Sequence, residues 1–209
     1  ELAEVVTIAD VLVINIGKLS KDQIESMKIS SKTANETGTP IILDPVGVGV
    51  TELRNRTTMD LINNYDITAI RGNITEIKAI AKLVGVLDES NTAKGVDVNA
   101  DDIITEDNLK ANGDLICNLS KKLDAVILAS GPIDILSDGK TTLAIYGGDE
   151  MMPLITGSGC MLSSIVGSCI GGSNPFEGSL VAILAMNIAG EKARAKVDAK
   201  DEGTGSFRA

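Results

Sequence analysis

A short glycine-rich segment, Thr156-Gly-Ser-Gly-Cys160, is the part of this sequence best suited to binding an anion. We expect a strand to precede it and a helix to follow it. Small residues at such a junction allow several backbone N–H groups to point toward one place, where the helix dipole adds partial positive charge. The segment matches neither common phosphate-binding loop, since GxxxxGK followed by Ser or Thr is absent and Leu162 stands where GxGxxG needs its third glycine. Taken alone, the segment is explained equally well by a helix that packs tightly against a sheet.

Cys160 would be the first residue of the expected helix, a position that favours the reactive thiolate form of a cysteine. The alternative is the usual one for a free cysteine, a small apolar side chain in the core. Cys117 and Cys169 lie within expected helices among apolar neighbours, and for these two we expect that structural role. Position alone therefore favours Cys160 as a possible base.

Polar side chains also stand at the ends of two other expected strands. Asp44 ends one buried strand, and Glu76 follows the turn that begins with Arg71 at the end of the next. In open α/β sheets, ligands bind beyond the carboxyl ends of the strands. A carboxylate there could bind Mg²⁺ through water or only cap the next turn, and Arg71 could bind phosphate oxygens in a bidentate manner or only form a surface salt bridge. A cation, carboxylates, an anion site and a base together are what phosphoryl transfer requires.

The hydrophobic pattern predicts alternating strands and helices that would position these residues. Expected strands cover residues 11–16, 40–44, 66–70, 125–129, 133–136, 142–146 and 150–155. Expected helices cover residues 2–10, 21–37, 51–63, 74–85, 105–123, 160–171 and 176–197, and the acidic stretch 86–107 is expected to be a surface excursion. The alternation implies a mainly parallel sheet with helices on both faces, and the short strands around Ser137-Asp-Gly-Lys140 add an antiparallel hairpin at one edge. We therefore expect one α/β domain over residues 1–209.

The composition excludes several classes of protein. The 209 residues are 44% hydrophobic and 23% charged, so the chain can bury a core and is not expected to be disordered. Lys+Arg 19 against Asp+Glu 29 gives a formal net charge of −10, which argues against a nucleic-acid partner. There is no histidine and no CxxC pair, which excludes a zinc site and a Ser-His-Asp triad within this chain.

The cysteines and the ends of the sequence bear on its location. The three cysteines form no disulfide framework, which indicates a reducing, cytoplasmic compartment. No apolar run reaches the eighteen or so residues of a membrane span, so we expect no membrane association. The sequence opens at Glu1 without a signal peptide. It lacks an initiator methionine and ends directly after a glycine-rich turn, so we expect segments at both ends to be missing from it.

Taken in order, several motifs resemble those of the hydroxyethylthiazole kinase family. They are Asp44-Pro-Val-Gly-Val-Gly49, Ile70-Arg-Gly-Asn-Ile-Thr-Glu76, Ser137-Asp-Gly139, Thr156-Gly-Ser-Gly-Cys-Met-Leu162, Ala189-Gly-Glu191 and Gly203-Thr-Gly-Ser-Phe207. The resemblance implies a ribokinase-like three-layer α/β/α sandwich. It also implies an enzyme that uses ATP and Mg²⁺ to phosphorylate the hydroxyethyl group of 4-methyl-5-(2-hydroxyethyl)thiazole, a precursor of thiamine.

The resemblance also implies roles for individual residues. It makes Cys160 the catalytic base and Gly157 a substrate-binding residue, with Gly157, Ser158, Gly159 and Cys160 as the anion hole. It makes Arg71 and Ser130 ATP-binding residues, and Asp44 and Glu76 the acidic residues around Mg²⁺ and the triphosphate. Members of the family are homotrimers with active sites between subunits. Two differences from the family stand out: its N-terminal segment, which supplies part of the thiazole pocket, is absent from this sequence, and the acidic stretch 86–107 is longer than usual.

Two alternative functions remain at this point. The first is another ribokinase-like enzyme, such as a hydroxymethylpyrimidine kinase or an ATP-dependent NAD(P)H-hydrate dehydratase. Those enzymes typically carry Asp at the position of Cys160, which is the discriminating residue. The second is a non-catalytic regulator that binds a nucleotide on the same fold, but a competent residue stands at each candidate catalytic position.

Overall fold

The computed structural model describes residues 1–87 and 103–208. Six strands form one sheet in the order β1-β2-β3-β4-β5-β6. They are β1 (Leu12–Asn15), β2 (Ile41–Asp44), β3 (Ala69–Asn73), β4 (Val126–Ser130), β5 (Asp134–Ser137) and β6 (Thr142–Ile145). The first four strands run parallel, and β5 and β6 are antiparallel at one edge. The predicted parallel sheet with an edge hairpin is therefore confirmed.

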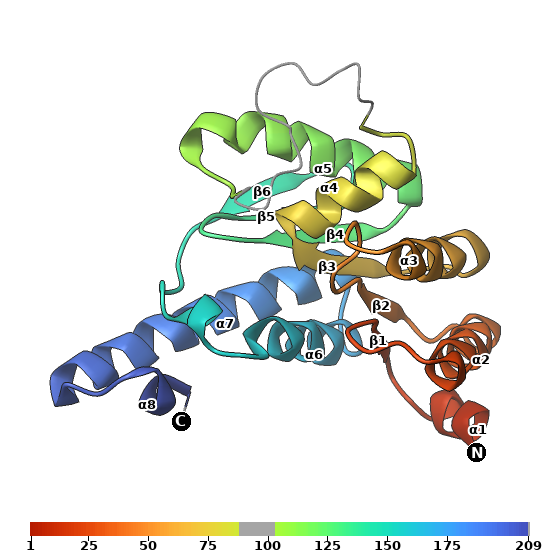
Figure 1. The fold of residues 1–209 in the computed structure, drawn as a ribbon, viewed down its shortest axis with the longest axis horizontal. Helices are drawn as coiled ribbons and strands as arrows, with labels where there is room; N and C mark the ends of the chain where they lie inside the picture. Colours follow the sequence, from red (N-terminus) through yellow and green to blue (C-terminus); the bar gives the residue numbers. More distant parts are fainter. Residues whose placement is uncertain (88–102, 209) are drawn as a thin grey trace.

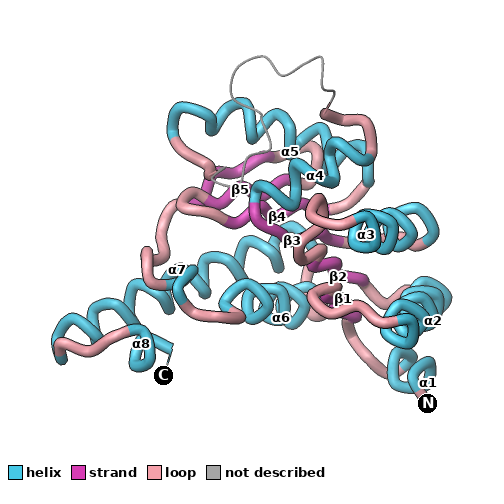
Figure 2. Tube along the Cα trace, in the orientation of Figure 1, coloured by secondary structure: helices cyan, strands magenta, loops and turns pink. Residues whose placement is uncertain are grey.

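Helices cover both faces of the sheet (Figures 1 and 2). They are α1 (Leu2–Thr7), α2 (Lys21–Thr37), α3 (Glu52–Asn64), α4 (Ile74–Leu83), α5 (Leu109–Leu123), α6 (Ser158–Ile170), α7 (Pro175–Lys200) and α8 (Thr204–Arg208), with short 3₁₀ helices η2 (Glu106–Asn108) and η3 (Met152–Leu154). Figure 1 shows α4 and α5 on one side of the strands and α6 and α7 on the other.

Alternating strand residues build two separate cores, because successive side chains of a strand point to opposite faces. Ile41 and Leu43 of β2 pack in the core that contains residues of α3, α4 and α5. Ile42, between them, packs in the core formed with α6 and α7. The three layers of the predicted α/β/α sandwich are thus confirmed. Among the described residues, no helix is both long and apolar enough to cross a membrane.

The parallel strands bring their carboxyl ends to one edge of the sheet. In the β1–β2 ladder Asn15 stands opposite Asp44, and in the β3–β4 ladder Asn73 stands opposite Ser130. Arg71 lies two residues before Asn73, within β3 rather than beyond it. Polar residues far apart in the sequence therefore share one edge, where the sequence predicted the site.

Two expectations for the segment before α6 are wrong. The strand expected at 150–155 is instead η3, because Gly147 and Gly148 turn the chain away from the sheet at φ 134° and 84°. Pro153 within η3 also lacks the N–H that a strand would donate. The helix expected at 160–171 begins earlier, at Ser158, with Gly157 at φ 90° as its N-cap, so Cys160 is its third residue and not its first. Of the surface excursion predicted at 86–107, residues 88–102 lie outside the described part of the chain.

Candidate active site at the strand ends

Arg71 lies against the first turn of α6. A Cβ atom built on Gly159 would stand 2.8 Å from Nη1 of Arg71, so the guanidinium occupies the space that a side chain would need. Its Nη2 donates a hydrogen bond to Oγ of Ser130 at 2.7 Å, while its buried Nε has no hydrogen-bond partner. Within the described residues Arg71 forms no salt bridge, and it is 9% exposed. The alternative of a surface salt bridge is therefore wrong, and the guanidinium keeps donors for a ligand.

The N-terminus of α6 offers backbone donors beside this cation. Gly157 caps the helix without a side-chain hydrogen bond, so the cap residue occupies none of the backbone N–H groups of the first turn. The N–H of Ser158 donates to the carbonyl of Ile155 at 3.2 Å, which leaves Gly159 and Cys160 as the better placed donors of the predicted anion hole. Together with the helix dipole, these amides and Arg71 form a positively polarised corner.

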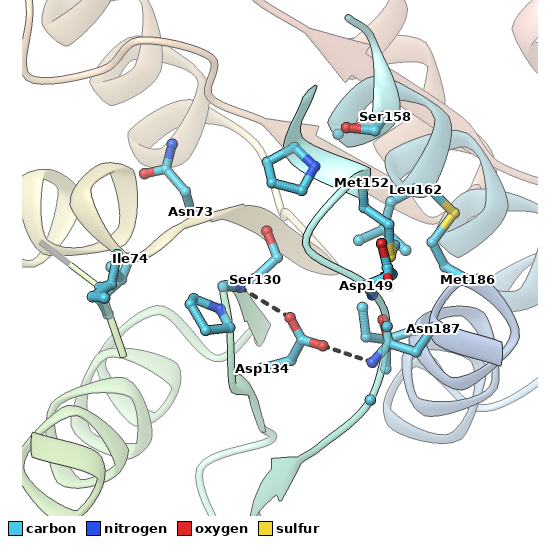
Figure 3. A pocket seen from close by; sticks show the side chains of 18 of the residues that line it. Asn73, Ile74, Ser130, Asp134, Asp149, Met152, Ser158, Leu162, Met186 and Asn187 are labelled. Carbon is cyan, nitrogen blue, oxygen red and sulfur yellow. Dashed lines mark hydrogen bonds between the residues drawn. The ribbon is translucent and has the colours of Figure 1, made fainter. Parts of the chain in front are cut away.

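A cavity of about 720 Å³ opens from this corner (Figure 3). Arg71, Ser130, Ser158 and Gly159 line it, together with Asn73 and Ile74 at the start of α4 and with Met186 and Asn187 of α7. Ligand cavities typically have volumes of about 300–1,000 Å³. The cavity is thus large enough for a nucleotide, with its cationic corner at the first turn of α6.

Asp134 is a buried carboxylate in the wall of the cavity that sequence reasoning missed. Its Oδ1 accepts a hydrogen bond from the N–H of Gly131 at 3.0 Å, and its Oδ2 accepts one from Nδ2 of Asn187 at 2.9 Å (Figure 3). Burial raises the pKa of Asp134, against the lowering effect of these hydrogen bonds and of the Arg71 charge. The available signal was a lone aspartate in an otherwise apolar strand.

The segment that links β6 to η3 in the cavity wall is held by α7. Oε1 of Glu191 accepts a hydrogen bond from the N–H of Gly148 at 3.1 Å. Nη1 of Arg194 lies 3.5 Å from Oδ1 of Asp149 and 3.3 Å from Oε1 of Glu150. These contacts fix the segment between β6 and η3, whose Gly147, Gly148 and Asp149 line the cavity.

Asp44 lies in a buried network at the other side of the α6 N-terminus. The residue is 1% exposed, and its Oδ2 accepts hydrogen bonds from Nδ2 of Asn15 and Oγ of Ser163, both at 2.7 Å. Its Oδ1 is buried without a hydrogen-bond partner. Burial raises the pKa of Asp44, and the hydrogen bond from Ser163, the Arg71 charge and the hydrogen bond from Asn15 oppose that rise.

Cys160 is exposed next to this network, so the alternative of a buried core cysteine is wrong for it. Its Sγ accepts a hydrogen bond from Nδ2 of Asn15 at 3.2 Å. Cys117 and Cys169 are half-buried, in keeping with the structural role expected for them. Neither Gly157 nor Cys160 lines the cavity, whose edge on α6 is formed by Ser158 and Gly159. The thiol therefore lies just beyond the end of the cavity.

Glu76 has a structural role that the sequence offered as an alternative. It forms a capping box with Asn73 at the start of α4, in which its Oε2 accepts from the N–H of Asn73 at 2.9 Å. Its Oε1 accepts from the N–H of Gly47 at 2.8 Å, which anchors the turn after Asp44. Glu76 thus links the ends of β2 and β3. Within residues 1–87 and 103–208, no three His, Cys, Asp or Glu side chains form a cluster that could hold a metal ion by itself.

Comparisons with known proteins agree on one family. A sequence profile described as the hydroxyethylthiazole kinase family matches residues 1–209. The chain is 71% identical to the hydroxyethylthiazole kinase of Methanobrevibacter smithii over 209 residues, which cover 100% of this chain and 73% of that relative. It is 50% identical to hydroxyethylthiazole kinase 2 of Methanosphaera stadtmanae over 208 residues, which cover 100% of this chain and 74% of the relative. The structure of a hydroxyethylthiazole kinase protein from Pyrococcus horikoshii OT3 superposes with a TM-score of 0.82 at 31% identity, covering 99% of this chain and 71% of that one.

Proposed function

This chain belongs to the hydroxyethylthiazole kinase family, and we propose that it transfers the γ-phosphate of ATP to the hydroxyl group of 4-methyl-5-(2-hydroxyethyl)thiazole. The observation that carries the proposal is the first turn of α6, where the Arg71 guanidinium packs on Gly159 and the exposed Cys160 follows. A phosphate donor and a proton acceptor would then meet at one helix end. The family match over residues 1–209 favours this kinase over the other ribokinase-like enzymes and over a non-catalytic regulator.

The proposed nucleotide site is the cavity between β3, β4 and α7. Arg71 and Ser130 would bind the triphosphate at the cavity end nearest α6, and the amides of the Gly157–Cys160 turn would surround the transferring phosphate. Phosphoryl transfer has a loose transition state, so fixed positive charge and positioning contribute most of the catalysis. The buried guanidinium supplies such a charge, because the Ser130 hydrogen bond holds it in place.

The proposed reaction places the substrate alcohol beside Cys160, with Gly157 at the thiazole. The hydroxyl oxygen attacks the γ-phosphorus, the bond from that phosphorus to the bridging oxygen of ADP breaks, and the hydroxyl proton passes to the Sγ of Cys160. The products are ADP and the thiazole phosphate. Cys160 is exposed and outside the cavity, which leaves room for an acceptor next to the phosphate site.

Asp44 and Glu76 fit a magnesium ion that is held mainly by the ATP phosphates. Mg²⁺ usually takes one or two carboxylates and keeps several waters, which suits a site without a larger acidic cluster. Oδ1 of Asp44 is buried and has no hydrogen-bond partner, whereas both oxygens of Glu76 already accept backbone N–H groups. Asp44 would therefore contribute more directly than Glu76. The ion, when bound, would neutralise charge that develops on the phosphates.

The proposal includes a homotrimer with active sites between subunits. Apolar side chains on α7 that no other described element covers support such an association: Val181, Leu184 and Ile188 are 56%, 39% and 48% exposed. Met161, which follows Cys160 on α6, is 42% exposed and would bring the same surface to the site. Light scattering of the eluted protein tests this directly, since a monomer would contradict it.

We also keep a reducing, cytoplasmic location as part of the proposal. All three cysteines are free, and the exposed Cys160 needs a reduced thiol for the role given to it. Disulfides form and persist mainly in oxidising compartments. Fractionation of cells that express the tagged protein measures its location.

Incubation with ATP, Mg²⁺ and hydroxyethylthiazole, followed by mass spectrometry, tests the proposed activity. The expected product is the thiazole phosphate, formed only when the ion is present. ADP without the thiazole phosphate would indicate a kinase for another alcohol. Binding of ATP without turnover would support the regulator instead.

A further inference from the structure

We propose that Asn15 is a positioning residue that holds the Sγ of Cys160 and joins it to Asp44. The inference rests on the proposed function, because it concerns the cysteine assigned as base. Asn15 is the last residue of β1, directly opposite Asp44 in the parallel ladder. From there its Nδ2 lies 2.7 Å from Oδ2 of Asp44 and 3.2 Å from Sγ of Cys160.

The neighbours of Asn15 fix which way its amide points. The N–H of Gly17, which can only donate, lies 2.8 Å from Oδ1 of Asn15. The oxygen of the amide must face this donor, so the NH₂ group must face the carboxylate and the sulfur. A Cβ atom on residue 17 would stand 2.8 Å from the same oxygen, so glycine permits this close approach.

The consequence for Cys160 follows from the chemistry of the NH₂ group, which donates and never accepts. Its two hydrogens go to two acceptors, Asp44 and the sulfur, so Sγ is held through one of its lone pairs. A proton on the sulfur must then point away from Asn15. A donated hydrogen bond also stabilises negative charge on the sulfur, the form able to take the proton of an alcohol.

Asp44 connects the two elements that hold Asn15 and Cys160, which are β1 and α6. Its Oδ2 accepts from Asn15 on β1 and from Ser163, which lies three residues after Cys160 on α6. The carboxylate is buried, so it cannot turn to solvent without losing both bonds. Buried networks of this kind hold their members in one arrangement. Asn15 is the member of this network that also bonds the exposed thiol.

The test is a double-mutant cycle on kcat and KM with Asn15→Ala, Cys160→Ala and the double variant. We expect Asn15→Ala to lower kcat about tenfold, the effect of one hydrogen bond to a charged group, with little change in KM for ATP. In the Cys160→Ala background the same substitution should have a much smaller effect, the part that comes from losing the donor to Asp44. An equal loss in both backgrounds would overturn the proposal, because a purely structural role does not depend on Cys160.

Ser163→Ala is the matched control, because it removes the other donor to Oδ2 of Asp44 but none to the sulfur. We expect it to have the same fold effect with and without Cys160. If Asn15→Ala does not fold, Asn15→Ser serves instead, since one hydroxyl hydrogen cannot satisfy both Asp44 and Cys160.

A second readout does not depend on activity. Iodoacetamide labelling followed by peptide mass spectrometry gives a rate for each cysteine, and Cys117 and Cys169 act as internal controls. We expect Asn15→Ala to slow labelling of Cys160 about fivefold and to leave the other two rates unchanged. An unchanged rate at Cys160 in the folded variant would overturn the proposal. Should the wild-type protein make no thiazole phosphate, the proposed function fails, and this labelling rate still tests the contact.

Discussion

Replacing Gly159 with alanine should weaken ATP binding while leaving α6 intact. The added Cβ would stand 2.8 Å from Nη1, 3.4 Å from Nη2 and 3.5 Å from Cζ of Arg71. Side-chain carbon atoms do not approach this closely, so the guanidinium must move away from the helix. Its movement would break the 2.7 Å hydrogen bond to Ser130 and take the charge out of the cationic corner.

The magnitude follows from what the guanidinium loses. The displaced guanidinium would lose a hydrogen bond to the phosphates of ATP, and a hydrogen bond to a charged group contributes about 1.5–3 kcal/mol. Every 1.4 kcal/mol or so is a tenfold change in a dissociation constant. We therefore expect the Kd for ATP to rise about 10- to 100-fold. Alanine is more favourable than glycine inside a helix by about 1 kcal/mol, which offsets the cost of moving Arg71, so the melting temperature should change little.

Isothermal titration calorimetry with ATP measures the effect, with circular dichroism to confirm the helix. Gly172→Ala is the control, because a Cβ atom there would meet nothing within 4 Å. The control should bind ATP like the wild-type protein. A folded Gly159→Ala variant with unchanged ATP affinity would refute the assignment of Arg71 to the nucleotide.

Three further predictions concern other residues of the site. Cys160→Ala should slow turnover by about 10²–10⁴-fold, the usual contribution of a general base, without abolishing it; complete inactivity of the folded variant would mean that positioning and charge contribute less than we propose. Glu191→Ala should raise KM for ATP about three- to tenfold, because Gly148 in the cavity wall loses the 3.1 Å hydrogen bond that holds it. An unchanged KM in steady-state assays would mean that this part of the cavity wall does not contact the nucleotide. Burial raises the pKa of Asp134 above its ordinary value of 3.8, so the carboxyl group of Asp134 binds a proton more tightly in the folded protein than in the unfolded chain. The free energy of unfolding should therefore fall as pH rises from about 3.8 through the raised pKa. Asp134→Asn should flatten this fall in urea titrations, and an identical pH profile for the two proteins would contradict it.

The order of the elements was predictable because it depends on local patterns. Strands such as Ile41–Asp44 are continuous apolar runs, and the helix before them begins with a serine cap and ends at Gly38, which adopts φ 73°. The parallel sheet followed from the alternation, since a crossover helix must separate parallel strands. The failure at residues 150–155 arose from Gly147 and Gly148, whose backbone conformation decides the path of the chain more than the apolar residues after them.

The sequence by itself determined which residues could take part in chemistry, because residue type and strand-end position are local properties. Arg71, Asp44 and the turn before α6 could be named in this way, whereas Ser130 was indicated by the family resemblance. Only the tertiary structure decided how they are used, since each contact joins residues distant in sequence. Glu76 holds the turn at Gly47, and Asn15 bonds Cys160 across 145 positions of the chain. The tertiary structure also decided which side chains reach the solvent. It leaves the thiol of Cys160 exposed and buries the carboxylate of Asp44, and neither result can be predicted from residue types alone.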